Sequence, residues 1–383
     1  MAKPKIRLKG FKGEWSNLSI TKIATLKAGK NFNKNDAVDF PMNGYYPCYG
    51  GNGQRGYVPY YNQEGTFNII GRQGALCGCV NIADGKFYAT EHAVLVTPIV
   101  DTDFNFLHES LVRANINQYA TGAAQPGISV ANVNAQLFLN MPLLDEQKAV
   151  GDYFKSLDSM IQGVTKEIAS LKQMKQACLV SMFPQAGETT PRVRFKGFKG
   201  EWGKDKAGNL FMTFNERNRP DLPMLSANQD IRGMAPRTDT GYNISHNKAN
   251  EVTYKVVKPG QYVIHLRSFQ GGFAHSSVEG ITSPAYTVFG FKDAERHDDY
   301  FWKIIFMSKE FIKSLETITY GIRDGRSISF SEFAEMNFYF PSKEEQQQIA
   351  SFFTSLDKQI SLQEARLEKL KQIKAACLDK MFV

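Results

Sequence analysis

Two segments of this chain occur twice, and this internal repeat restricts the possible folds more than any other feature of the sequence. The segment Arg7–Trp15 recurs as Arg194–Trp202 with a single substitution, at its second position. A longer segment, 146–183, recurs without a gap as 345–382. The repeat therefore predicts two halves built on one structural plan.

The longer repeat carries apolar residues at alternating steps of four and three, the pattern of a coiled-coil seam. They are Val150, Phe154, Leu157, Ile161, Val164, Ile168 and Leu171, and then Ile349, Phe353, Leu356, Ile360, Leu367 and Leu370. A lysine interrupts each seam at the same place, Lys175 in one copy and Lys374 in the other. The spacing also fits a helix packed in any bundle, but about 35 residues make a helix of about 50 Å. Because that is too long for one small domain, we expect the two helices to pair with each other in antiparallel orientation.

Between the repeated segments lie two stretches, 16–141 and 203–340, that are not alike in sequence. Both are rich in Gly, Asn and Tyr and contain short β-type runs set off by Gly, Asn and Pro, which predict strands. Examples are Thr66–Ile70, Ala93–Thr97, Tyr262–Leu266 and Ala285–Phe289. We therefore expect an α+β protein with two mixed α/β domains, joined by two long antiparallel coiled-coil helices in a pseudo-twofold internal repeat.

The expected domain boundaries follow from the repeat. The first globular domain covers 1–142 and the second 203–341, and the helical regions cover 143–183 and 342–383. Residues 184–202 hold the linker, Pro184–Pro191, and the start of the second repeat.

Composition narrows the function. The net charge of +8 favours a polyanionic partner such as nucleic acid. The five cysteines contain no C-x2-C pair, which argues against a disulfide framework or a zinc ribbon and fits a reducing compartment. Cys77-Gly-Cys79 and His108-Glu109 lack the additional ligands of a metal site, so we assign no metal. No stretch reaches the roughly 18 apolar residues of a membrane span, and we expect a cytoplasmic protein.

Familiar signatures of catalysis are missing or incomplete in this sequence. Gly51–Gly56 satisfies G-x-G-x-x-G, but the residues that follow do not predict the helix that would hold a pyrophosphate. We interpret the segment as a glycine-rich loop. The sequence also lacks a phosphate-binding loop for ATP and the Asn/Asp-Pro-Pro-aromatic motif of adenine methyltransferases.

The repeated helices and differing globular segments together resemble the specificity subunit of type I restriction-modification systems, over essentially the whole chain. The repeated nonapeptide carries this resemblance, together with Pro142–Gln147 and Pro341–Gln346 where the helices begin. Thr121–Ser129 and Tyr320–Ser329 look like the loops that close each target-recognition domain of that family.

The first globular domain also shows the most recognisable pattern of these recognition domains. It lies in Tyr46–Tyr57 followed by Ile69–Ala75. In the second domain, Leu225–Gln229 and Val263–Arg267 occupy the comparable places and match more weakly.

The resemblance implies a subunit that recognises DNA and has no catalytic activity of its own. Its partners would be double-stranded DNA, two methyltransferase subunits and, where the system includes them, restriction subunits. S-adenosylmethionine would belong to the methyltransferase, and ATP and Mg to the restriction subunit, with no cofactor bound by this chain. The target would be asymmetric and bipartite, and its adenines would be methylated by the partner.

Arginine can contact guanine with two hydrogen bonds, and Asn or Gln can contact adenine in the same way, so these side chains are the candidate DNA contacts. Those we select, with one lysine, are Lys30, Asn52, Gln54, Arg55, Arg72, Gln73, Gln125, Asn228, Gln229, Arg232, Arg267, Gln270, Arg323 and Arg326.

Two other function classes remain open from the sequence. A stand-alone DNA-modifying enzyme with unrecognised motifs would cleave or methylate DNA without a partner. A structural adaptor with a helical spacer would bind all duplexes equally.

Overall fold

The computed structural model of the chain describes residues 3–74, 76–122, 126–185, 187–228, 233–239, 248–265, 272–315 and 328–383. It divides into two compact units. Unit 1 consists of Met1–Glu167 with Gln363–Val383, and unit 2 of Ile168–Leu362. Each unit is described by itself.

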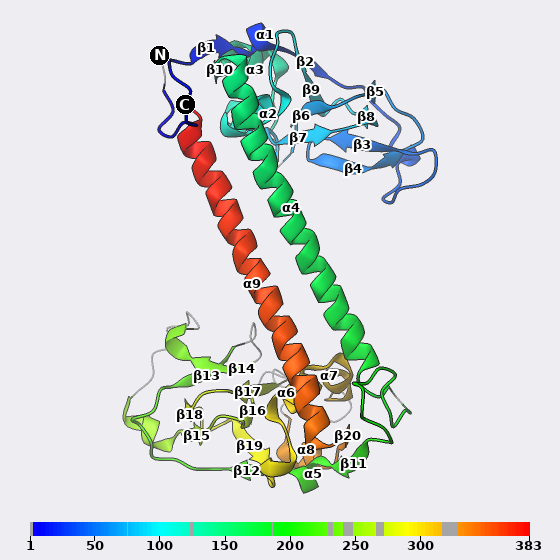
Figure 1. Cartoon of the computed structure of the whole chain (residues 1–383), viewed down its shortest axis with the longest axis vertical. Coiled ribbons are helices and arrows are strands. Elements are labelled where there is room, and N and C mark those ends of the chain that lie inside the picture. Colours follow the sequence, from blue (N-terminus) through cyan, green and yellow to red (C-terminus); the bar gives the residue numbers. More distant parts are fainter. Residues whose placement is uncertain are drawn as a thin grey trace. The chain divides into compact units, whose positions relative to one another are not determined.

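Two long helices, α4 (Leu144–Ser181) and α9 (Lys343–Met381), each contribute one half to unit 1 and the other half to unit 2. In unit 1, Lys374 of α9 pairs with Asp158 of α4 and Gln363 with Glu167. Residue numbers thus rise along one helix as they fall along the other, and the two helices run side by side (Figure 1). The predicted antiparallel pairing is confirmed.

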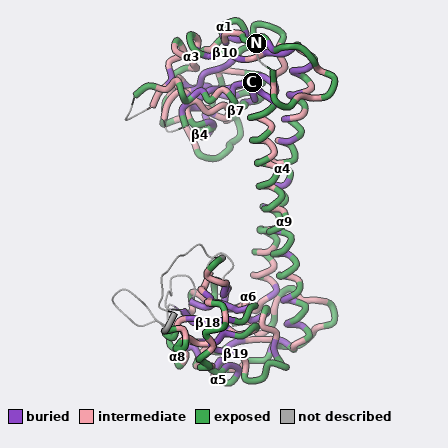
Figure 2. Tube along the Cα trace, turned by 90° about the vertical axis from the view of Figure 1, so that its left-hand side faces the viewer, coloured by how far each residue is buried: buried purple, intermediate pink, exposed green. Residues whose placement is uncertain are grey.

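The predicted seam is the buried side of these helices. Val150, Phe154 and Leu157 of α4 are buried in unit 1, and Ile349 and Phe353 of α9 are buried in unit 2. Outward-facing positions of both helices are exposed, as Figure 2 shows. An apolar stripe at steps of three and four therefore stabilises the pair by burial.

The seam lysines form ion pairs across the two helices. In unit 1 the Lys374 ammonium lies 2.7 Å from Asp158 Oδ1 and 2.8 Å from Glu109 Oε1. In unit 2, Lys175 pairs with Asp357. Burial acts to lower the pKa of Lys374, but its hydrogen bonds to Asp158 and Glu109 outweigh that effect and raise the pKa. The interruption of the seam is therefore a charged contact at a matching place in each unit.

Unit 1 contains a globular domain of short strands and helices. One four-stranded sheet has the order β2-β9-β6-β7, with β2 (Ala24–Ala28), β9 (Ala93–Pro98), β6 (Phe67–Gly71) and β7 (Val80–Ala83) all antiparallel. A second has the order β4-β3-β8-β5, with β4 (Gly53–Val58), β3 (Tyr46–Gly50), β8 (Lys86–Ala89) and β5 (Gln63–Glu64). The remaining elements are β1 (Ser16–Ser19) paired with β10 (Phe138–Met141), and the helices α1 (Ile20–Ile23), α2 (Phe104–Arg113) and α3 (Val130–Gln136).

Unit 2 repeats this plan around a larger sheet. Its six strands have the order β12-β19-β16-β17-β14-β13, and they are β12 (Phe211–Phe214), β19 (Thr287–Phe291), β16 (Tyr262–Ile264), β17 (Phe273–Ser276), β14 (Gly233–Pro236) and β13 (Leu225–Asn228). Two further pairs are β11 (Gly203–Lys206) with β20 (Asn337–Phe340) and β15 (Lys255–Val257) with β18 (Gly280–Thr282). The helices are α5 (Ala207–Leu210), α6 (Asp299–Met307), α7 (Lys309–Leu315) and α8 (Phe330–Ala334).

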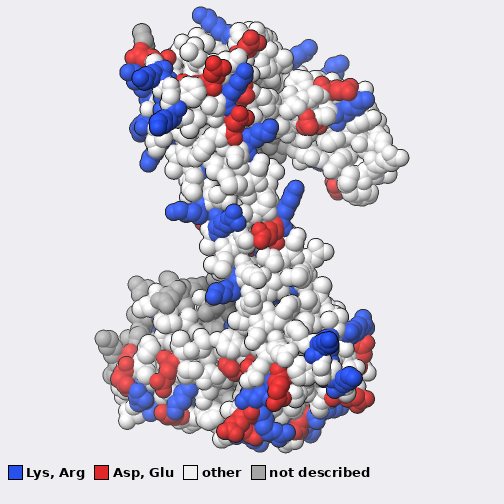
Figure 3. Space-filling view, in the orientation of Figure 1, with Lys and Arg blue, Asp and Glu red and all other residues white. Residues whose placement is uncertain are grey.

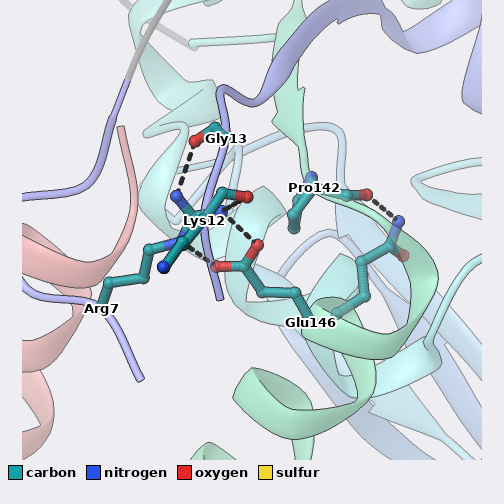
Figure 4. Close-up of polar contacts among 6 residues, drawn as sticks. Arg7, Lys12, Gly13, Pro142 and Glu146 are labelled. Atoms are coloured by element: carbon teal, nitrogen blue, oxygen red, sulfur yellow. Dashed lines mark hydrogen bonds and ion pairs between the residues drawn. The ribbon is translucent and has the colours of Figure 1, made fainter. Parts of the chain in front are cut away.

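The repeated nonapeptide fixes the start of each long helix. Arg7 donates from Nε and Nη2 to both carboxylate oxygens of Glu146 at 2.7 Å, and from Nη1 to the Gly13 carbonyl at 2.6 Å (Figure 4). Arg194 makes the matching contacts with Glu345 in unit 2, at 2.6 and 2.7 Å. Each glutamate is almost fully buried, so only a charged, two-pronged donor such as arginine satisfies it.

The glutamine that follows each of these glutamates joins the long helix to its globular domain. Gln147 donates to the Pro142 carbonyl at 2.9 Å and accepts from the Asp103 amide at 3.2 Å. Gln346 does the same with Pro341 and Asp298, at 2.9 and 3.0 Å. The Glu-Gln motif that begins each helix therefore has a structural role.

Aromatic side chains at the ends of the long helices complete both cores. Phe382 packs on Trp15, Phe106 and Phe154 in unit 1. In unit 2, Phe183 packs on Trp202 and on α6 and α9 in the same way.

Candidate nucleic-acid interface

Three segments of unit 1 meet to form one surface: the turn between β3 and β4, the bend after β6, and residues 126–128. The Ile128 amide donates to the Arg72 carbonyl at 2.8 Å, and the Gly74 amide donates to the Pro126 carbonyl at 3.1 Å. Gln73 pairs with Gly127 through the backbone. Segments far apart in the sequence thus present their polar side chains together.

Glycines make this convergence possible. A Cβ atom on Gly71 would lie 1.9 Å from the Gly51 carbonyl oxygen, and one on Gly51 would lie 2.3 Å from the Gln73 carbonyl oxygen. No side chain fits at such distances, so the two backbones can approach only where both residues are glycine. The glycines of the recognition-domain pattern therefore hold the β3–β4 turn against the bend after β6.

Side chains of β7 and the turn before it support the β3–β4 turn from behind. Cys79 donates from Sγ to the Gly51 carbonyl at 3.5 Å, and Asn81 donates from Nδ2 to Cys79 Sγ at 3.4 Å. These contacts give the Cys79 thiol a structural role at the turn. No group of three or more potential metal ligands occurs among the described residues.

The segment Thr90–His92, which lies between β8 and β9, forms backbone contacts with Lys30, with β3 and with Arg72. The Thr90 amide donates to the Tyr49 carbonyl at 2.9 Å, and the Arg72 amide donates to the His92 carbonyl at 2.8 Å. Lys30 pairs with Thr90 through the backbone. Sequence reasoning missed this segment and its half-exposed Glu91 and His92, whose side chains lie 3.3 Å apart. The available signal was a pair of ionisable residues directly before the predicted strand Ala93–Thr97.

The first-domain candidates differ in how freely they can reach a ligand. Lys30, Asn52, Gln54 and Arg55 are exposed, whereas Arg72 and Gln73 are partly buried. The Arg55 guanidinium lies over the Phe32 ring, 5.4 Å from its centroid. Arg72 donates from Nε to the Ile128 carbonyl at 3.1 Å, which holds its guanidinium at the edge of the surface.

The glycine motif Gly51–Gly56 forms the β3–β4 turn and the first part of strand β4. No helix follows the glycines, as the sequence predicted, but residues from Gly53 onward belong to strand β4 rather than to the glycine-rich loop that we expected. The positive φ of Gly53, 88°, belongs to this hairpin turn. The motif therefore has no helix N-terminus of the kind that binds a pyrophosphate.

Most second-domain candidates cannot be placed. Asn228 ends β13, opposite Gly233 of β14. Seven of the predicted residues lie outside the described residues, namely Gln125, Gln229, Arg232, Arg267, Gln270, Arg323 and Arg326. The role of each remains a prediction.

His108-Glu109, which we considered as a partial metal motif, has structural contacts instead. His108 Nδ1 lies 2.7 Å from Asn68 Oδ1, and burial lowers the pKa of His108 to about 4. Glu109 pairs with Lys374 of α9. These two residues therefore attach helix α2 to the sheet and to the long helices.

No described helix is long and apolar enough to cross a membrane.

Comparison with known proteins identifies the family. The family described as type I restriction modification DNA specificity domain matches twice, over residues 12–173 and 200–372. The chain belongs to this family. The two matches correspond to the two copies of the internal repeat.

Individual relatives agree with this assignment. A type I restriction enzyme EcoprrI specificity subunit from Escherichia coli is 34% identical over 166 residues, which is 43% of this chain and 40% of that protein. The match thus spans about two-fifths of the length of the curated relative. The S subunit of a type I restriction-modification system from M. genitalium has a TM-score of 0.68 at 15% identity, over 100% of this chain and 99% of that one. A structure from work on complex assembly and conformational transition of the type I R-M system has a TM-score of 0.51 at 14% identity, over 97% and 98%. These solved structures confirm the expected fold.

We expect Gly71→Ala to disrupt the candidate DNA-contacting surface of unit 1 and to abolish the base preference that this surface is expected to confer. The added Cβ would collide with the Gly51 carbonyl oxygen at 1.9 Å and with Cys79 Sγ at 2.9 Å, so the β3–β4 turn has to move. Losing one or two base contacts at about 1–3 kcal/mol each lowers affinity by roughly a hundredfold. Selection of binders from a randomised duplex pool checks this. The control is Gly163→Ala on α4, where a Cβ meets open space; equal base preferences for both variants would contradict the expectation.

Proposed function

We propose that this chain is the DNA-sequence-recognition subunit of a type I restriction-modification complex and has no catalytic activity of its own. It binds an asymmetric, bipartite DNA target, with one half-site read by the globular domain of each unit. The observation that carries the proposal is the surface of unit 1 on which Asn52, Arg72 and Gln73 meet. Their amide and guanidinium groups are those that read adenine and guanine in the major groove.

The difference between the two globular domains supports an asymmetric target. The sheet of unit 2 has six strands, whereas unit 1 has two sheets of four. The contacts that tie each globular domain to its long helix match in the two units, as in the Arg7–Glu146 and Arg194–Glu345 pairs. A constant scaffold with two different reading domains suits two different half-sites.

The proposed partners follow from the family. Two methyltransferase subunits, which bind S-adenosylmethionine, would dock on the long helices and methylate adenine, and restriction subunits would supply ATP- and Mg-dependent cleavage. The chain itself would bind no cofactor and act in the cytoplasm.

Selection from a randomised duplex pool tests the function. The purified chain, alone and with its methyltransferase, should enrich two short sequences separated by bases of no preference. Equal affinity for all duplexes would overturn the proposal in favour of a structural adaptor. Methyl transfer or cleavage by the purified chain alone would favour a stand-alone enzyme.

Arg72→Ala should weaken binding to the selected target by about 1–3 kcal/mol and relax the preference at one base pair, if this guanidinium contacts a base. Arg72→Lys keeps the charge but loses the two-pronged donor, so it should relax the same preference with a smaller loss of affinity. Competition binding on single-base variants of the target measures both effects. A uniform loss over all sequences with a shallower salt dependence would instead assign Arg72 to phosphate contact.

A further inference from the structure

The two copies of the nonapeptide take the same conformation and the same pattern of exposure. In each copy the arginine is partly buried, the tryptophan is buried, and both lysines and the glutamate are exposed. Two glycines with positive φ shape each loop: Gly10 and Gly13 in unit 1, Gly197 and Gly200 in unit 2. We call residues 8–14 and 195–201 the basic loops.

The fold explains the arginine, the glycines and the tryptophan, but it does not explain the lysines. Lys9 and Lys12 in unit 1, like Lys196 and Lys199 in unit 2, are exposed. Within the described ranges, none of these four ammonium groups has a hydrogen bond or an ion pair. Because exposed positions of this kind usually tolerate substitution, their identity in the two copies requires a cause outside the fold.

The chain itself shows how far exposed positions have diverged between the two copies. On the long helices, the exposed Thr165 and Lys166 correspond to Glu364 and Ala365. Even inside the basic loops, a partly buried position differs, since Leu8 corresponds to Phe195. Lysines that stay the same while a packed position of the loop and exposed positions of the long helices change indicate contact with a partner that meets both units in the same way.

The position of the loop in unit 1 favours a protein partner over DNA. The N-terminal segment lies on one side of α4 and α9, whereas β3 and β4, which carry the candidate DNA contacts, lie on the other (Figure 1). Lys and Arg side chains gather over the N-terminal segment of unit 1 and, separately, over the segment that follows α4 in unit 2 (Figure 3). DNA bound at the candidate interface would therefore lie away from this loop.

Each basic loop also adjoins the exposed face of a long helix. Arg7 and Arg194 tie the loops to Glu146 and Glu345 in the first turns of α4 and α9. In unit 2 an open hollow runs from the loop onto α9, lined by Phe195, Glu344, Gln347, Gln348, Ser351 and Phe352. The basic loop and the helix start thus form one continuous surface.

We propose that the two basic loops are matched docking points for an acidic surface of the methyltransferase, with one methyltransferase copy on each loop. This inference rests on the proposed function, because it assumes that two methyltransferase copies bind this chain. Complementary charge would orient each copy at the start of one long helix.

Charge reversal at the loops tests the inference. Lys9→Glu/Lys12→Glu and Lys196→Glu/Lys199→Glu should each weaken one methyltransferase site by at least about tenfold, because they place like charges opposite the acidic surface. Native mass spectrometry should then count one bound copy for each double variant and none for the quadruple variant. The matched controls, Lys22→Glu/Lys27→Glu in unit 1 and Lys309→Glu/Lys313→Glu in unit 2, carry the same charge change at other exposed lysines and should keep two copies.

The outcomes separate the two proposals. If the unaltered chain binds two copies and the quadruple variant also binds two, the docking inference is overturned while the proposed function stands. If the unaltered chain binds no methyltransferase, both are overturned. If the quadruple variant, without partner, loses affinity for DNA and still binds two methyltransferase copies, the loops contact DNA and the docking inference is overturned. Hydrogen exchange of the buried helix amides verifies that each variant is folded.

Discussion

Replacing Arg194 with alanine is expected to destabilise unit 2 by about 3–5 kcal/mol, the usual cost of leaving a buried charge without its partner. The Glu345 side chain is only 1% exposed and accepts both of its short hydrogen bonds from this guanidinium. Without Arg194, its carboxylate stays buried at the start of α9, next to the Gln346 side chain that joins the helix to α6.

Chemical denaturation followed by hydrogen exchange checks this expectation. Protection should fall at the first turns of α9 and in the aromatic core of unit 2. The matched control is Arg192→Ala, two residues away, because its ion pair with Glu188 is exposed to solvent and should contribute little to stability. If the two variants unfold at the same denaturant concentration, the buried pair is not a main support of unit 2. Arg7→Ala should produce the same loss in unit 1.

A second large effect is expected from lengthening both long helices together. Four residues inserted after Thr165 and four after Glu364 should lengthen the unread spacer of the DNA target by roughly two base pairs while both half-sites stay the same. Four residues add about 6 Å to a helix, and base pairs are spaced by about 3.4 Å. Methylome sequencing of cells that carry the variant reports spacer and half-sites directly.

The seam ion pairs make this experiment specific. Both insertion points lie between the pair Lys374–Asp158 of unit 1 and the pair Lys175–Asp357 of unit 2. A double insertion keeps both pairs, whereas an insertion in α4 alone would force one of them out of register. We therefore expect the single insertion to abolish methylation at any fixed spacer. An altered half-site at an unaltered spacing would contradict the view that the helices set the spacer.

Much of the scaffold could be predicted because its signals are local or repeated. Helix α4 follows from apolar residues at steps of three and four, a period that only a helix places on one side. The strand character of β6 and β9 follows from their β-forming runs. The glycines around Gly51 indicated a glycine-rich loop rather than a cofactor site, since no helical pattern follows them.

Side-chain partners depended on the tertiary structure, because a sequence pattern carries no information on contacts between distant segments. Lys374 was visible as an interruption of the seam, but its partners Asp158 and Glu109 come from two other helices. Arg7 was visible as part of a motif, but its pairing with Glu146 was not.

The same division holds for the candidate interface. The sequence by itself determined that the chain has two similar helical segments and two different globular domains, and it indicated a glycine-rich segment that carries candidate DNA contacts. Only the tertiary structure decided that Arg72 is held by the Ile128 carbonyl, that Cys79 supports Gly51, and that the segment around Glu91 joins the candidate segments. The physical reason is range: periodicity and turn chemistry act between neighbours in the sequence, whereas hydrogen bonds and close backbone contacts join whatever residues folding brings together.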